Sequence, residues 1–97
     1  ALRLTGFEVD AVAAGLAQSC LEIILHDLAF AAGRPVPRLV EVRDTLATSP
    51  RAHFDLVIGN PPYGRVSLDA AQRGKFARGL YGHANLYGLF TDAALQW

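Results

Sequence analysis

Two consecutive prolines directly after an apolar run are the feature that most limits how this chain can fold. Residues 54–59 read Phe-Asp-Leu-Val-Ile-Gly, and the chain continues with Asn60, Pro61, Pro62 and Tyr63. An uninterrupted apolar run is typical of a strand that is buried on both faces of a parallel sheet. Proline lacks the backbone N–H that a sheet ladder needs. The pattern therefore predicts a buried strand over 54–59 that ends in a rigid loop.

Strand-like and helix-like segments alternate along the rest of the chain. Alternation of apolar residues predicts strands over 2–9 and 39–43, and apolar residues spaced by threes and fours predict a long helix over 11–32. A short helix is expected over 69–78 and a final helix over 86–97. Strand–helix alternation is typical of an α/β fold, here with three mostly parallel strands and flanking helices.

The long predicted helix begins and ends at recognisable signals. Asp10 stands at the N-cap position, and Gly33 followed by prolines is a typical helix stop. The spacing indicates an apolar stripe that we expect to face the core, with Cys20 as a small core side chain and Gln18 on the opposite side. The stripe consists of Val12, Leu16, Cys20, Ile23, Ile24 and Leu28.

Composition excludes several classes of protein. Nine Lys and Arg balance nine Asp and Glu, so the net charge is zero and a strongly basic nucleic-acid-binding arm is excluded. A hydrophobic content of 52% is too high for a disordered chain. No apolar run reaches the ~18 residues of a membrane helix. A single cysteine allows no internal disulfide, and no zinc spacing occurs. We expect a cytoplasmic domain without a metal.

Polar residues close each of the three predicted strands. Glu8 and Asp10 follow the first strand, Asp44 the second and Asn60 the third. In parallel sheets, ligands bind outside the carboxyl ends of the strands. We therefore expect these side chains to lie on one ligand-binding edge, although an N-cap role explains Asp10 better than ligand binding.

The loop after the third predicted strand combines groups that suit an aromatic amino group. The Asn60 side-chain oxygen and the Pro61 carbonyl are two acceptors that could converge on one nitrogen. If both N–H groups were donated, the nitrogen lone pair would be freed for attack. Tyr63 offers a flat face, and base stacking on an aromatic ring contributes ~1–3 kcal/mol. Taken alone, the same residues could also form a rigid turn.

Residues 54–64 resemble the catalytic motif of S-adenosylmethionine-dependent N6-adenine DNA methyltransferases of the restriction-modification type. Residues 5–10, 42–46 and 85–90 resemble three further motifs in the family's order. The resemblance implies a partial Rossmann-like methyltransferase fold over residues 1–97, from the second-strand motif through the helix after the catalytic loop. In the intact enzyme, adenine would be flipped out of double-stranded DNA.

The resemblance also implies roles for individual residues. Glu8 would bind the ribose hydroxyls of S-adenosylmethionine, Asp44 would contact the cofactor adenine, and residues 85–90 would line the pocket. The implied catalytic residues are Asn60, Pro61, Pro62 and Tyr63. The implied cofactor-binding residues are Glu8, Asp44, Asn60, Leu86 and Phe90.

Other interpretations remain open. Release-factor glutamine methyltransferases and some RNA base methyltransferases carry the same or a similar loop, and a non-catalytic remnant that serves as an interaction segment is a further alternative. The basic residues after the loop are interpreted as solvated, with DNA phosphate contact as an alternative; they are Arg65, Arg73, Lys75 and Arg78. Phe76, Tyr81 and Tyr87 are interpreted as packing residues. The histidines, at 26, 53 and 83, are interpreted as surface residues.

The family's first motif, a glycine-rich turn after the first strand, does not occur in this sequence. The chain also contains no methionine. We expect a piece of a longer enzyme that lacks the central strand of its sheet. Unpaired strand edges are unfavourable, so we expect the isolated segment neither to fold stably nor to methylate.

Overall fold

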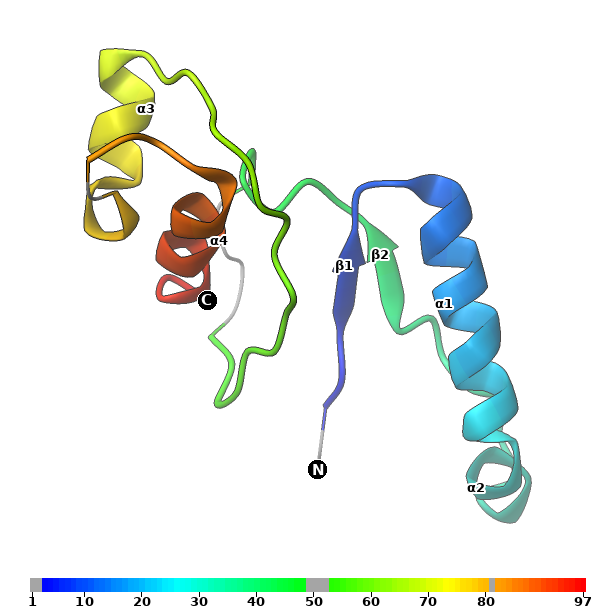
Figure 1. The fold of residues 1–97 in the computed structure, drawn as a ribbon. Coiled ribbons are helices and arrows are strands. Elements are labelled where there is room, and N and C mark those ends of the chain that lie inside the picture. Colours follow the sequence, from blue (N-terminus) through cyan, green and yellow to red (C-terminus); the bar gives the residue numbers. More distant parts are fainter. Residues whose placement is uncertain (1–2, 49–52, 81) are drawn as a thin grey trace. The chain divides into compact units, whose positions relative to one another are not determined.

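The computed structural model describes residues 3–48, 53–80 and 82–97 (Figure 1). Its contacts form two units, Ala1–Thr45 and Leu46–Trp97, and each is described by itself. The first unit contains β1 (Gly6–Glu8), α1 (Ala11–Ile24), α2 (His26–Ala31) and β2 (Val40–Val42). The second contains α3 (Ala70–Lys75), the 3₁₀ helix η1 (Ala77–Gly79) and α4 (Leu86–Ala94). The first residue of the strand predicted over 2–9 lies outside the described residues, as does Tyr81, which was interpreted as a packing residue.

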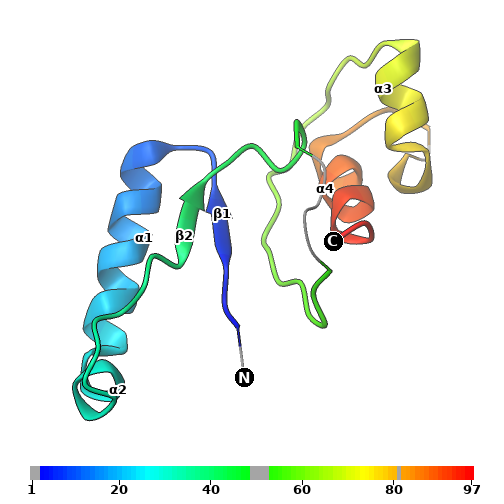
Figure 2. The same cartoon turned by 180° about the vertical axis from the view of Figure 1, so that it is seen from behind.

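The first unit is a small α/β arrangement built on two parallel strands. β1 pairs with β2 in a register that sets Gly6 opposite Val40 and Glu8 opposite Val42. The ladder extends by one bond, because the Arg43 N–H donates to the Glu8 carbonyl at 2.8 Å. α1 connects the strands and runs alongside them in both views (Figures 1 and 2). The parallel pairing predicted for these two segments is confirmed.

The face of α1 that lies on the strands differs from the predicted one. Ala14 is buried, and Gln18 and Leu21, one and two turns further on, are half-buried. Gln18 Oε1 accepts from the N–H groups of Leu39 and Val40 at 2.8 and 3.1 Å. Its Nε2 donates to the Pro37 carbonyl at 3.1 Å. A polar side chain therefore anchors the helix, because it pairs backbone groups at the start of β2 that would otherwise be unsatisfied.

The apolar stripe predicted to face the core is exposed instead. Ile23 is 76% exposed, and the other apolar members are similarly open. Cys20 is exposed too, so its interpretation as a core side chain is wrong. The physical reason is that Ala14, Gln18 and Leu21 face the strands instead, so the stripe lies on a side of α1 that the described residues of this unit leave uncovered.

The single helix predicted over 11–32 is divided at Leu25. Its φ of −93° and ψ of 4° leave the helical region, although its N–H still donates to the Leu21 carbonyl at 2.8 Å. α2 then ends where predicted. Gly33 has a positive φ of 63°, and Arg34 N–H donates back to the Ala29 carbonyl at 3.2 Å. This is the glycine-terminated helix end that the sequence indicated.

The second unit is held together by α4. Asp69 caps α3 through a reciprocal capping box with Gln72, and η1 continues the chain, so the predicted helix over 69–78 becomes two short pieces. The buried apolar side chains of the unit come mostly from α4 and its neighbours. They are Phe76, Ala84, Leu89, Ala93 and Trp97.

The third predicted strand, over 54–59, is not formed. The chain from residue 53 to residue 64 is coil, and the described residues contain two strands rather than three (Figure 1). A strand needs a neighbour to supply ladder hydrogen bonds, and no strand among the described residues of this unit does so. Ile58 is accordingly 85% exposed. Phe54 is tied to the end of the unit, because its N–H donates to the Trp97 carbonyl at 2.7 Å and the two rings stack.

Candidate active site

The loop that carries the candidate catalytic residues is open to solvent. Asn60, Pro62 and Tyr63 are exposed, and Pro61 is half-buried. No helix or strand includes this loop, so the two prolines supply its local stiffness by fixing their own φ angles. An exposed amide and an exposed ring on a stiff loop are available to a substrate.

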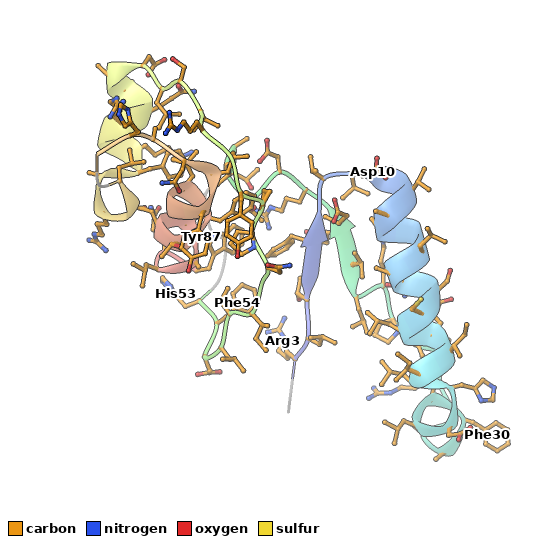
Figure 3. All side chains as sticks on the ribbon, viewed as in Figure 1. Arg3, Asp10, Phe30, His53, Phe54 and Tyr87 are labelled. Atoms are coloured by element: carbon orange, nitrogen blue, oxygen red, sulfur yellow. The ribbon has the colours of Figure 1, made fainter. Side chains whose placement is uncertain are left out.

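Tyr63 is stacked on a second aromatic ring from α4. The ring centroids of Tyr63 and Tyr87 lie 6.0 Å apart, and the ring planes differ by 7°. Figure 3 shows Tyr87 projecting from the start of α4 toward the coil. The separation lies within the range that is typical of interacting aromatic pairs. The interpretation of Tyr87 as a packing residue is thereby refined, since what it packs against is the ring of the candidate catalytic loop.

Two backbone hydrogen bonds hold the end of the loop against the start of α4. Leu86 N–H donates to the Gly64 carbonyl at 2.9 Å, and Val66 N–H donates to the Ala84 carbonyl at 3.1 Å. We call this pair of bonds the loop bridge. It flanks an isolated antiparallel bridge between Arg65 and Asn85. The loop bridge brings the segments 60–64 and 85–90, which resemble two separate motifs, side by side.

Asn85 has a local role that the sequence reasoning missed. Its side-chain oxygen accepts from the Gly88 N–H at 2.7 Å and so caps α4. The signal was present, because Asn is among the preferred N-cap residues and stands immediately before the predicted helix. The cap fixes where α4 begins and therefore where Tyr87 stands.

A buried carboxylate, also missed from the sequence, secures the other side of α4. Asp92 is 1% exposed. Its Oδ2 accepts from the Gly79 N–H at 3.0 Å, and its Oδ1 accepts from Gln96 Nε2. An acidic residue on the apolar face of a predicted helix was the available signal, since a buried charge requires hydrogen-bond partners. The contact fixes η1 against α4.

The candidate cofactor edge lies in the first unit. Glu8 ends β1, and Asp44 stands two residues beyond Val42, the register partner of Glu8. Glu8 Oε1 accepts from the Asp10 N–H at 2.9 Å. Asp10 in turn caps α1, with Oδ1 accepting from the Ala13 N–H at 2.8 Å, so its N-cap role is confirmed (Figure 3). Glu8 and Asp44 therefore lie at the same edge of the sheet, at the carboxyl ends of the two paired strands.

The remaining candidate residues lie in the second unit. Leu86 and Phe90 are half-buried on α4, and the Leu86 side chain reaches Gly64. Asn60 belongs to this unit as well. Its convergence with Glu8 and Asp44 on one edge stays a prediction, as do the cofactor-binding roles of Leu86 and Phe90.

The basic residues after the loop and the three histidines are exposed. Lys75 Nζ donates to the Leu46 carbonyl at 2.9 Å, so this side chain has a structural contact. Phe76 is buried, as its interpretation as a packing residue requires.

Across residues 3–48, 53–80 and 82–97, no group of three or more metal-ligating side chains occurs. In that same part of the chain, no helix is both long and apolar enough to cross a bilayer.

Comparison with known proteins gives one match. The model of the family described as Eco57I restriction-modification methylase matches residues 26–97. That range includes Asp44, the candidate catalytic loop and α4. No curated protein and no solved structure matches the chain.

Proposed function

Because the chain belongs to the Eco57I restriction-modification methylase family, we propose that it carries the catalytic loop of an S-adenosylmethionine-dependent enzyme that methylates adenine at N6 in double-stranded DNA. Membership of the family supports a restriction-modification methyltransferase. The cofactor, the base and the position on the base are the proposal. The observation that carries it is the exposed Tyr63 ring, supported from α4, on the same stiff loop as the Asn60 amide and the Pro61 carbonyl.

A flipped adenine would use all three groups of the loop. Its ring would stack on Tyr63, which would offset part of the few kcal/mol that unstacking from the duplex costs. The Asn60 side-chain oxygen and the Pro61 carbonyl would accept the two N–H groups of its amino nitrogen. These acceptors would already be in place before the reaction begins. Such positioning and electrostatic preorganisation lower the activation barrier.

The acidic residues of the first unit fit a nucleoside cofactor. Carboxylates accept hydrogen bonds, and a ribose offers two hydroxyl donors while an adenine offers an amino group. Glu8 would hold the ribose and Asp44 the adenine, and Leu86 and Phe90 would supply half-buried apolar surface. When bound, the cofactor supplies a methyl group that is activated by a positively charged sulfur.

Substitution of Asn60 in the full-length enzyme tests this function. We expect Asn60→Ala to lower methyl transfer to DNA by about 10²- to 10³-fold, the loss associated with removing one preorganised partner, while Glu8 and Asp44 retain most of the affinity for S-adenosylmethionine. Asp55→Asn is the matched control, because Asp55 is exposed on the same coil and should leave transfer unchanged.

The product identifies the substrate. Labelled methyl groups should be recovered as N6-methyladenine after digestion of the DNA. Labelling of a release-factor glutamine or of RNA, with none in DNA, would replace the proposal by one of the alternatives. Full activity of Asn60→Ala would remove the role assigned to the loop.

A further inference from the structure

Among the described residues, the ring of Tyr63 has one aromatic neighbour and few other contacts that hold it. Tyr63 is 80% exposed and stands on coil. Within the part of the chain that the structure describes, no hydrogen bond fixes its hydroxyl group, and its ring contact is with Tyr87. A ring that must stack on a base benefits from a fixed plane, because an adjustable ring loses side-chain entropy on binding.

Tyr87, by contrast, stands on a well-anchored element. It is the second residue of α4, whose first turn is fixed by the Asn85 cap and by the loop bridge. Its carbonyl accepts from Thr91 Oγ1 at 2.9 Å. One residue further, Gly88 packs directly against Gly79. The backbone that carries the Tyr87 ring is therefore held from several sides.

The separation of the two rings decides which face of Tyr63 a base can use. A base inserted between the rings would need about twice the ~3.4 Å spacing of stacked bases. The centroids of the near-parallel rings are 6.0 Å apart, which is less than that spacing, so an inserted base does not fit between them. Tyr87 therefore lies on one side of the Tyr63 ring, and a base must take the other side.

We propose that Tyr87 is a positioning residue that sets the plane of the Tyr63 ring, so that a flipped adenine stacks on the face of Tyr63 that Tyr87 leaves open. This inference rests on the proposed function and adds to it a residue outside the catalytic loop. Tyr87 acts through Tyr63 and not on the base itself. Its phenyl ring is the active part, because stacking needs the ring and not the hydroxyl group.

A double-mutant cycle in the full-length enzyme tests the inference. Single-turnover methylation rates are measured for Tyr87→Leu, Tyr63→Ala and the double variant, with Tyr87→Phe as the conservative replacement. We expect Tyr87→Leu to lower the rate by about 2- to 10-fold, in line with the coupling of an aromatic pair. Tyr87→Phe should keep the wild-type rate. In the Tyr63→Ala background, Tyr87→Leu should have no further effect.

A spectroscopic readout separates positioning from general loss of structure. 2-Aminopurine at the target position should be quenched by stacking on Tyr63 in the wild type and in Tyr87→Phe, and should be brighter with Tyr87→Leu. Leu95→Ala is the matched control, because it shortens an exposed apolar side chain at the opposite end of α4 from Tyr87. If Tyr87→Leu does not fold, Tyr87→Met replaces it in the cycle.

The outcomes distinguish this inference from the function beneath it. If wild-type enzyme methylates DNA adenine but Tyr87→Leu slows the wild type and Tyr63→Ala by equal factors, the positioning role is wrong and the function stands. If wild-type enzyme transfers no methyl group to DNA adenine, the proposed function fails and the inference falls with it. Absence of further slowing in the double variant, together with brighter 2-aminopurine, supports both.

Discussion

Gly79 and Gly88 pack backbone against backbone, so that a β-carbon built on either residue would collide with the carbonyl oxygen of the other. This contact joins η1 to the first turn of α4. It lies one residue from Tyr87, and Asp92 reinforces it by accepting the Gly79 N–H. The orientation of the candidate catalytic ring pair therefore depends on a close approach that side chains would prevent.

Gly88→Ala should destabilise the full-length enzyme, although alanine is a better helix former. The atom that a new methyl group would meet is a backbone oxygen, which cannot move aside as a flexible side chain could. Overpacking of this kind costs about 1–3 kcal/mol. The control is Gly74→Ala on α3, where a β-carbon meets nothing within 4 Å and should stabilise the helix by about 1 kcal/mol. Thermal unfolding should shift in opposite directions for the two variants, and equal shifts would contradict the close contact.

Asp92→Ala should also weaken the second unit. The substitution removes one of the two acceptors of the Gly79 N–H, the other being the Phe76 carbonyl at 3.1 Å, and it also removes the buried acceptor of Gln96 Nε2. Loss of these buried hydrogen bonds costs about 1–3 kcal/mol. Asp92→Asn keeps an acceptor oxygen and should cost less. Urea unfolding of both variants measures the difference. A wild-type midpoint for Asp92→Ala would show that the buried carboxylate contributes no stability.

Gln18→Ala should loosen the attachment of α1 to β2. It removes the acceptor of the Leu39 and Val40 N–H groups and the donor to Pro37. We expect faster hydrogen exchange at those two amides and a loss of about 1–3 kcal/mol. Ser19→Ala, on the exposed neighbouring position, is the control and should change neither quantity. Unchanged exchange in Gln18→Ala would mean that water replaces the amide at no cost.

Glu8→Gln should reduce S-adenosylmethionine affinity while Asp10→Asn should not. Hydrogen bonds to a charged group contribute about 1.5–3 kcal/mol, so the dissociation constant should rise by roughly 10- to 100-fold for Glu8→Gln. Asn caps helices as well as Asp does, and Asp10→Asn therefore keeps α1 intact. Isothermal titration calorimetry on the full-length enzyme gives both constants. Equal effects of the two substitutions would indicate a helix-capping effect and not a ribose contact.

Features that depend on neighbouring residues in the chain were predicted from the sequence more successfully than features that depend on the tertiary arrangement. The Asp10 cap, the Gly33 stop and the parallel pairing of the first two strands all follow from residues adjacent in the chain or from simple alternation. The face of α1 did not follow, because a helix packs on the face that has a partner, and apolar periodicity contains no information about that partner. Gln18 was assigned to the wrong side for the same reason, since its amide pairs with backbone groups that a pattern of side chains does not contain.

The strand predicted over 54–59 shows a second kind of limit. An apolar run indicates that a segment favours a strand when a neighbouring strand is present. The inter-strand hydrogen bonds themselves depend on that neighbour. The candidate catalytic loop was located by its prolines, which act on their own residues. Its aromatic partner was not, because the loop bridge, a contact between segments far apart in the sequence, brings Tyr63 and Tyr87 together.

The loop bridge has a consequence for how enzymes of this kind can diversify. Gly64 is hydrogen-bonded to Leu86, and Val66 is hydrogen-bonded to Ala84. The two ends of the stretch from Val66 to Ala84 are therefore held next to each other. Between the loop bridge and Phe76, whose buried side chain belongs to the core of the unit, that stretch can gain or lose residues at a cost that rises only slowly with length. The candidate catalytic loop at one end of this stretch and the surface displayed along it can therefore change independently of each other.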